Sequence, residues 1–231
     1  MASLPPGGIE ARRHDLIRLL PSCDRRVGAE LDGADRSGVQ AWVSAGRPFV
    51  VRSQPRPFAS DRIALGLPLP PAAAKRRIAL EVDRACVSAV ERPPLLDATL
   101  HALSAMWCDA LATLDRSAKH VGIVLRVYGS IAFQSLTGLP YLHAASDVDL
   151  LWTPPDRGVL AAGLAVLAAW ERSSGLRADG EILFGASGVS WREWQRGAPR
   201  VLVKSIEGPA LRDRAELLAL LDAGVPEESV A

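Results

Sequence analysis

Two aspartates interrupt an apolar run in the middle of the chain, and this run constrains the fold more than any other segment. It reads Asp147-Val148-Asp149-Leu150-Leu151. Side chains alternate between faces in a β-strand, so Asp147 and Asp149 project on one side, about 7 Å apart at their Cα atoms. Placing two carboxylates in such a strand is costly unless a cation compensates them. The run therefore predicts a strand that presents a carboxylate pair in a cleft.

A second motif lies upstream, where the apolar and β-branched run 123–127 ends at Gly129-Ser130. This pattern is typical of a buried strand that passes through a turn into a helix. Gly129 lets the backbone approach a ligand closely, and Ser130 can cap the helix. Free N–H groups at a helix N-terminus bind phosphate, so we expect Gly129 and Ser130 to bind substrate phosphates.

The two motifs together indicate phosphoryl transfer. Alone, Gly-Ser after a strand is most often a turn, and Asp-x-Asp is most often a solvated edge. Carboxylates two residues apart suit Mg²⁺, which usually takes one or two carboxylates plus phosphate oxygens. Such ions stabilise the attacking and leaving oxygens of an in-line displacement. We therefore interpret Asp147 and Asp149 as catalytic ligands of a divalent metal.

The order of strand, Gly-Ser, helix and Asp-x-Asp resembles the nucleotidyltransferase superfamily of the polymerase-β type. The continuous run 127–130, 136–142 and 146–151, with Trp-Arg-Glu-Trp at 191–194, resembles the malonate decarboxylase holo-acyl-carrier-protein synthase family. Its members are phosphoribosyl-dephospho-CoA transferases. The resemblance implies transfer of 2'-(5''-triphosphoribosyl)-3'-dephospho-CoA to a serine of the acyl-carrier subunit of malonate decarboxylase, with release of pyrophosphate.

The superfamily also uses a third carboxylate on the strand beside the Asp-x-Asp pair. Asp179 is our preferred candidate, as a metal ligand or proton acceptor, and Glu181 is the alternative. The segment 178–180 also has the Asp-Gly signal of a hairpin turn. Lys204 either meets the triphosphate as a point charge or lies on an exposed edge. His143 is either catalytic or a loop contact.

The prolines after Arg92 mark a boundary, because Pro93 and Pro94 cannot continue a helix or an inner strand. We expect a small α+β module at 1–92 and a nucleotidyltransferase-type α/β domain at 93–231, with helices flanking a mixed sheet. The patterns predict helices at 32–45, from 96 through 114, at 156–175 and at 209–223, and strands at 48–52, 63–69, 77–82, 176–184 and 201–205. The aromatic pair Trp191 and Trp194 either stacks an adenine or packs over the sheet.

Composition narrows the class of protein. Hydrophobic residues make up 48% of the chain, which is ample for a core. The balance of 27 basic against 26 acidic residues does not suggest nucleic-acid binding by charge. Cys23, Cys86 and Cys108 show no metal-ligand spacing, so we expect thiols of a reducing compartment. No leader or membrane span is visible, and we expect a cytoplasmic protein.

Two other functions stay open on the residues alone. The first is a nucleotidyltransferase that uses ATP or another NTP on a small molecule or a protein. The second is a module that binds a nucleotide or a carrier protein without catalysis. The carboxylate pair argues against a pure binder, because such a protein has no need for negative charge beside phosphate.

Overall fold

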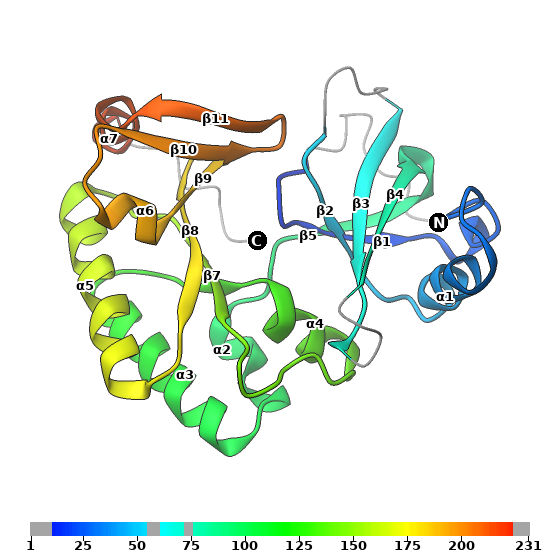
Figure 1. The fold of residues 1–231 in the computed structure, drawn as a ribbon, viewed down its shortest axis with the longest axis horizontal. Coiled ribbons are helices and arrows are strands. Elements are labelled where there is room, and N and C mark those ends of the chain that lie inside the picture. Colours follow the sequence, from blue (N-terminus) through cyan, green and yellow to red (C-terminus); the bar gives the residue numbers. More distant parts are fainter. Residues whose placement is uncertain (1–10, 55–60, 72–75, 224–231) are drawn as a thin grey trace. The chain divides into compact units, whose positions relative to one another are not determined.

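The structure is a computed structural model that describes residues 11–54, 61–71 and 76–223. The chain divides into two compact units, and the division falls between Pro93 and Pro94. We call the described residues up to 93, together with 206–208, the N-terminal unit, and residues 94–205 and 209–223 the C-terminal unit. Each unit combines a β-sheet with helices (Figure 1), so the predicted mixed α+β class is confirmed.

The N-terminal unit is built on a five-stranded sheet of order β4-β3-β2-β1-β5. Its elements are β1 (Leu16–Leu19), η1 (Pro21–Cys23), α1 (Gly33–Ser44), β2 (Phe49–Val51), β3 (Arg62–Pro68), β4 (Arg77–Asp83), η3 (Arg84–Cys86) and β5 (Val87–Glu91). Strand β4 buries every second side chain, Ile78, Leu80 and Val82, as a sheet with one core face requires. The predicted helix and strands of this region are all present.

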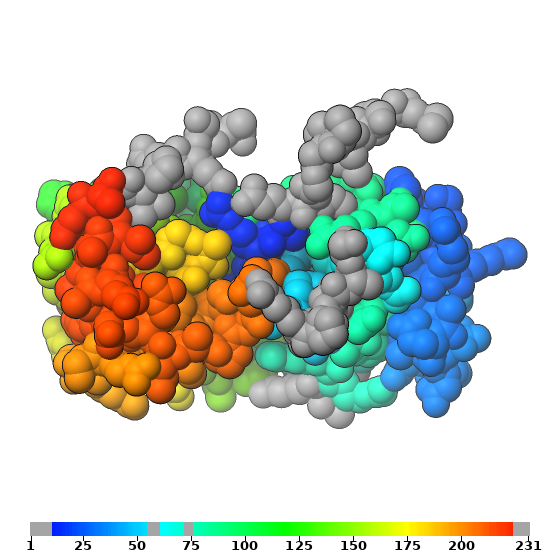
Figure 2. Space-filling view, turned by 90° about the horizontal axis from the view of Figure 1, so that it is seen from above, coloured from blue at the N-terminus to red at the C-terminus, as the bar shows by residue number. Residues whose placement is uncertain are grey.

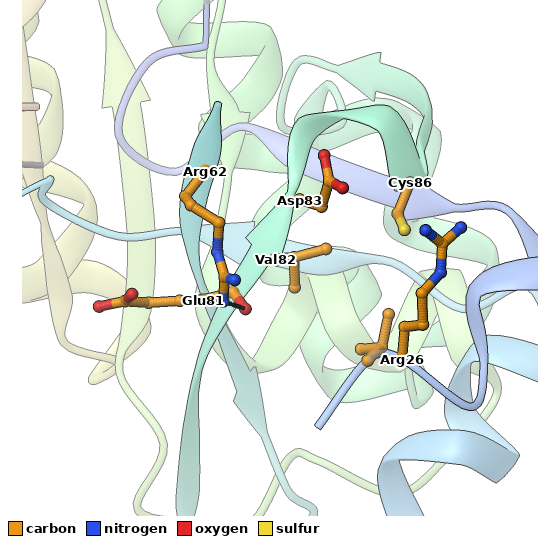
Figure 3. Close-up of a pocket in the computed structure, with 7 residues that line it drawn as sticks. Arg26, Arg62, Glu81, Val82, Asp83 and Cys86 are labelled. Carbon is orange, nitrogen blue, oxygen red and sulfur yellow. Dashed lines mark hydrogen bonds between the residues drawn. The ribbon is translucent and has the colours of Figure 1, made fainter. Parts of the chain in front are cut away.

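A disulfide between Cys23 and Cys86 joins the 3-10 helices η1 and η3, with a Cα–Cα distance of 5.8 Å. The expectation of unpaired thiols is therefore wrong for these two residues, whereas Cys108 is free. The pair is 63 residues apart in sequence, and no local pattern indicates a contact at that separation. Beside the disulfide lies a pocket of about 160 Å³ (Figure 3), lined by Arg26, Val27, Arg62, Glu81, Val82, Asp83 and Cys86.

The C-terminal unit contains a six-stranded mixed sheet of order β11-β10-β9-β8-β7-β6. Its strands are β6 (Arg126–Val127), β7 (Val148–Trp152), β8 (Ala178–Phe184), β9 (Ser187–Ser190), β10 (Arg200–Ser205) and β11 (Gly208–Asp213). Its helices are α2 (Leu96–Thr99), η4 (Leu100–Ala102), α3 (Ala105–His120), α4 (Gly129–Thr137), α5 (Arg157–Ser174), α6 (Trp191–Gln195) and α7 (Arg214–Asp222). Strands β7 and β8 pair in parallel, while β6 with β7, β8 with β9 and β9 with β10 pair antiparallel.

Helix α5 is the crossover that returns the chain from β7 to β8, as predicted. Asp156 caps it by accepting a hydrogen bond from the Val159 N–H at 2.8 Å, and Gly175 ends it with a φ of +71°. Gly163 allows close packing on the sheet, because a Cβ there would lie 2.3 Å from Ile123 Cδ1. Helices α3 and α5 pack together (Figure 1) and share a core with Val148, Leu150, Ile182 and other apolar side chains of the sheet.

Two predicted helices differ from the structure. The helix expected from Leu96 through Leu114 is interrupted, because Leu103 is extended with ψ of 154° and Ser104 then begins α3 as its N-cap. The helix expected at 209–223 is shorter, since residues up to Asp213 form the edge strand β11. Proline is tolerated in an edge strand, which explains Pro209. Gly224, the expected helix end, lies outside the described residues.

The C-terminal elements β10, β11 and α7 gather on one surface of their unit, coloured orange to red in Figure 2. Strand β11 is exposed along most of its length, and Leu211 is 56% exposed. Among the helices of the described residues, none has the length and apolar character needed to cross a membrane.

The disulfide yields a stability prediction. Cross-linking residues 63 apart removes chain entropy from the unfolded state, so the double variant Cys23→Ser/Cys86→Ser should lose about 4 kcal/mol of unfolding free energy. Urea unfolding is followed by tryptophan fluorescence, to which Trp42 contributes as the sole tryptophan in residues 1–93. The Cys108→Ser variant, which touches no disulfide, should unfold like the parent. An unchanged urea midpoint in the double variant would contradict this prediction.

Candidate active site

The site begins where β6 turns into helix α4. Gly129 is the first residue of α4 and has a φ of +62°, in the left-handed region that favours glycine. Tyr128 occupies the N-cap position, and its side chain makes no capping hydrogen bond. Ser130 therefore lies inside the first turn, and the expectation that it caps the helix is wrong. The first-turn N–H groups receive no capping hydrogen bond from the Tyr128 side chain, and they point toward the end where an anion binds.

Asp149 lies directly against this helix start. A Cβ atom on residue 129 would stand 2.0 Å from Asp149 Oδ2, so no larger side chain fits there. The Tyr128 N–H also donates to the backbone oxygen of Asp149 at 3.1 Å. Gly129 and the carboxylate, which are separate motifs in the sequence, are thus brought together. Their contact joins a helix N-terminus with a carboxylate of the central strand.

Three aspartates project from the same face of the parallel strand pair. Asp149 in β7 lies opposite Asp179 in β8, and residues in register on neighbouring strands are about 4.8 Å apart. Asp147 precedes β7 by one residue, two positions before Asp149. Residues 178–180 belong to β8, so the alternative of a hairpin turn does not apply. The Asp179 carboxylate accepts a hydrogen bond from the Gly180 N–H at 2.8 Å.

Arg177 also belongs to this face, and it was missed in the sequence. The Val148 N–H donates to the Arg177 backbone oxygen at 2.8 Å, which extends the parallel register so that Arg177 stands beside Asp147. Arg177 Nε is 3.7 Å from Asp147 Oδ1. Arg177 and Asp179 are two residues apart, and side chains two apart in a strand lie on one face. Once residues 178–184 are recognised as a strand, this spacing predicts that Arg177 lies on the same face as Asp179.

Glu181 and Lys204 form a separate pair on this face. Lys204 Nζ lies 3.1 Å from Glu181 Oε1, and the Glu181 side chain is only 4% exposed. Strand β10 is three strands away from β7, which corresponds to roughly 14 Å across the sheet. The structure therefore pairs Lys204 with Glu181 and does not bring it beside Gly129 or Ser130.

The segment between α4 and β7 is held by side-chain hydrogen bonds. Gln134 Oε1 accepts from the N–H groups of Tyr141 and Leu142 at 3.1 and 3.0 Å. His143 Nδ1 accepts from the Ala145 N–H at 3.1 Å, which makes this histidine a loop contact. A groove of about 370 Å³ opens beside this segment, lined by Ala102, Gln134, Gly138, Leu139 and Pro140.

The tryptophan pair belongs to the core. Trp191 and Trp194 are 2% and 1% exposed. Trp194 packs on Phe184 with ring centroids 4.9 Å apart, and the guanidinium of Arg192 lies 4.7 Å from the centre of the Trp191 ring. The alternative of packing over the sheet is confirmed, since buried rings offer no open face to an adenine.

The residues of the site fit a magnesium ion that is shared with a substrate. Within the described part of the chain, no group of three or more His, Cys, Asp and Glu side chains is arranged to hold a metal. Asp147 and Asp149, two residues apart at the start of β7, provide two hard oxygen donors, and Mg²⁺ usually needs no more than this when phosphate oxygens complete its shell. The chemistry of the donor set thus suits the metal expected from the sequence.

Comparisons with known proteins cover both units. The chain matches the model of the phosphoribosyl-dephospho-CoA transferase MdcG N-terminal domain over residues 12–93 and that of the C-terminal domain over residues 95–215. No solved structure matches the chain significantly.

Several relatives carry the name phosphoribosyl-dephospho-CoA transferase. One from Xanthomonas campestris pv. campestris is 39% identical over 208 residues, which cover 90% of this chain and 96% of the relative. One from Bradyrhizobium diazoefficiens is 38% identical over 217 residues, 93% of each chain. Another from Pseudomonas aeruginosa is 34% identical over 191 residues, 79% of this chain and 88% of the relative. The resemblance inferred from the motifs is confirmed, and the chain belongs to the phosphoribosyl-dephospho-CoA transferase family.

Proposed function

We propose that this protein transfers the prosthetic group of 2'-(5''-triphosphoribosyl)-3'-dephospho-CoA to a serine of the malonate decarboxylase acyl-carrier subunit. The reaction forms a phosphodiester and releases pyrophosphate. One observation carries the proposal: the Asp149 carboxylate lies against the Gly129 turn and faces Asp179 in register. A carboxylate pair beside an uncapped helix N-terminus is an arrangement suited to phosphoryl transfer.

We also infer that the C-terminal unit is a nucleotidyltransferase-type domain. Three features support this: strand β6 leads into α4, which begins with Gly129-Ser130; Asp147 precedes β7 by one residue and Asp149 lies within it; and the parallel neighbour β8 carries Asp179. Helices α3 and α5 share the core with the opposite face of these strands. The charged face is thereby left for substrate.

Asp147 and Asp149 are the residues proposed to hold the divalent metal. When bound, Mg²⁺ would neutralise negative charge on the triphosphate and on the leaving pyrophosphate. The first-turn N–H groups of α4, from Gly129 and Ser130, orient the phosphate chain through hydrogen bonds and the helix dipole. The glycine at 129 leaves the space in which the Asp149 carboxylate stands.

Asp179 is the residue proposed to accept the proton of the attacking hydroxyl. The oxygen of the carrier serine attacks the phosphorus nearest the ribose, and the bond from this phosphorus to the pyrophosphate oxygen breaks. The serine proton passes to a carboxylate oxygen of Asp179, which lies about 4.8 Å from Asp149 in the ladder. Asp179 Oδ1 accepts from the Gly180 N–H, which fixes the orientation of the carboxylate.

The first prediction tests the three aspartates individually. The variants Asp147→Asn, Asp149→Asn and Asp179→Asn keep the side-chain shape and remove the charge. Each should slow transfer by about 10²–10³-fold, because metal binding or proton acceptance is lost. The measurement is mass spectrometry of the purified carrier subunit after incubation with Mg²⁺, the triphosphoribosyl donor and each protein. The parent should add a mass equal to phosphoribosyl-dephospho-CoA.

The same assay separates the alternatives. If the folded parent protein leaves the mass of the carrier subunit unchanged, the proposed function is wrong. Release of pyrophosphate from ATP or another NTP would then favour a nucleotidyltransferase with a different substrate. Transfer that persists at the parent rate in the Asp149→Asn variant would exclude the proposed role of that carboxylate.

A second prediction concerns Gly129 and has a matched control. Gly129→Ala should abolish measurable transfer, because the new Cβ would displace the Asp149 carboxylate. Gly138 has nearly the same backbone, with φ of +68°, but a Cβ there meets no atom within 4 Å. Gly138→Ala should therefore cost about 1–2 kcal/mol of stability and retain transfer. Equal activity of the two variants would argue against the Gly129–Asp149 contact as a requirement.

A third prediction concerns the Lys204–Glu181 pair. Lys204→Met leaves Glu181 buried without its cation and should cost about 2 kcal/mol of unfolding free energy, which is less than for a fully buried pair because Lys204 is 39% exposed. Adding Glu181→Gln should recover most of the stability and the transfer rate. Urea unfolding and the mass assay measure the two quantities. A stable but inactive double variant would instead indicate that one of the two residues acts directly in the reaction. Lys204 would then bind the triphosphate, or Glu181 would be the third carboxylate.

A further inference from the structure

We propose that Arg177 binds the pyrophosphate portion of the donor, and that it pairs with Asp147 only until the donor arrives. This inference rests on the proposed function and adds a substrate-binding residue to the same site. It concerns a side chain that neither the motifs nor the family descriptions single out.

The position of Arg177 follows from the parallel ladder. Val148 pairs with Ala178 and Asp149 with Asp179, so the residues one step earlier, Asp147 and Arg177, are also neighbours. The four side chains at 147, 149, 177 and 179 form two rows on one face of the sheet. The rows are about 7 Å apart along the strands, a span that a chain of phosphates bridges. Arg177 occupies the row next to the one that contains Asp149 and Asp179.

The contact of Arg177 in the structure is weak. Its Nε lies 3.7 Å from Asp147 Oδ1, beyond normal hydrogen-bond distance, and the side chains of Arg177 and Asp147 are 63% and 37% exposed. Exposed pairs of this kind contribute little to stability. Little free energy is therefore needed to move the guanidinium from the carboxylate to a ligand in front of the sheet.

Two other cations of this unit, Arg192 and Lys204, have closer partners. Arg192 forms an ion pair with Glu171 and donates to the Ala178 backbone oxygen at 2.8 Å. Lys204 lies 3.1 Å from Glu181. These side chains stabilise the fold where they are. Arg177 differs because its recorded partner, Asp147, is itself needed for the metal under the proposed function.

The charges of the site favour a cation at this place. Three carboxylates would face a donor that carries a triphosphate, and like charges at short range repel. Arginine stays charged at all working pH values, and its forked donors match phosphoryl oxygens in pairs. Arg177 would compensate Asp147 in the free enzyme and then compensate phosphate in the complex. Asp147 would at that moment become available to the metal.

The test measures binding rather than turnover. Pyrophosphate binding in the presence of Mg²⁺ is measured by isothermal titration calorimetry. The proteins compared are the parent, Arg177→Gln, Arg177→Lys and the control Arg172→Gln, which changes an exposed arginine of α5. Arg177→Gln should weaken pyrophosphate binding by about 10- to 100-fold, the loss expected for a charged hydrogen bond. Arg177→Lys should lie between Arg177→Gln and the parent, and Arg172→Gln should equal the parent.

A second ligand distinguishes a local effect from misfolding. Dephospho-CoA lacks the triphosphate, so Arg177→Gln and the parent should bind it equally. Equal pyrophosphate affinity in Arg177→Gln and the parent overturns the inference, as does a parallel loss of affinity for both ligands. If Arg177→Gln binds pyrophosphate more weakly while the parent transfers nothing to the carrier, the assignment of Arg177 to phosphate binding is supported and the proposed function is wrong.

Discussion

The parallel pairing of β7 with β8 is the constraint on which the rest of the C-terminal unit depends. Parallel neighbours need a crossover, and here α5 provides it. The helix brings Leu160 and Leu167 into the core shared with the apolar face of the sheet, so charged side chains are restricted to the other face. Because parallel register aligns residues directly, the aspartate of one strand meets the aspartate of the next.

Three carboxylates of this face, those of Glu181, Asp147 and Asp149, have a source of positive potential nearby. Glu181 is buried and has Lys204 within 3.1 Å. Asp147 has Arg177 nearby, and Asp149 lies at the N-terminus of α4, where the helix dipole is positive. The distance from carboxylate to cation increases with the exposure of the carboxylate. Buried Glu181 has its cation at 3.1 Å, and half-exposed Asp147 has its cation at 3.7 Å. This difference separates the structural ion pair Lys204–Glu181 from the pair Arg177–Asp147, which is able to exchange partners.

Local signals predicted the elements whose ends are fixed by a single residue. Helix α5 was predicted from Asp156 and Gly175, and the structure shows a capping hydrogen bond at one and left-handed backbone at the other. Contacts between distant residues were not predictable. The Cys23–Cys86 bond and the Lys204–Glu181 pair each depend on how the strands assemble. The Lys204–Glu181 pair, for example, joins β10 to β8 across the intervening strand β9. Apolar spacing alone also cannot reveal the extended backbone at Leu103 that divides α2 from α3.

The same geometry links metal binding to donor binding under the proposed function. Two aspartates on one strand leave most positions of an octahedral magnesium ion to be filled by water or phosphate. A triphosphate brings oxygens and negative charge together, so each of the two ligands strengthens the binding of the other, as linkage requires. Arg177 acts in the same direction, because a phosphate that draws its guanidinium away also frees Asp147. The pairing of Arg177 with Asp147 thus opposes metal binding before the donor is present, and the loss of this pairing on donor binding makes Asp147 available to the metal.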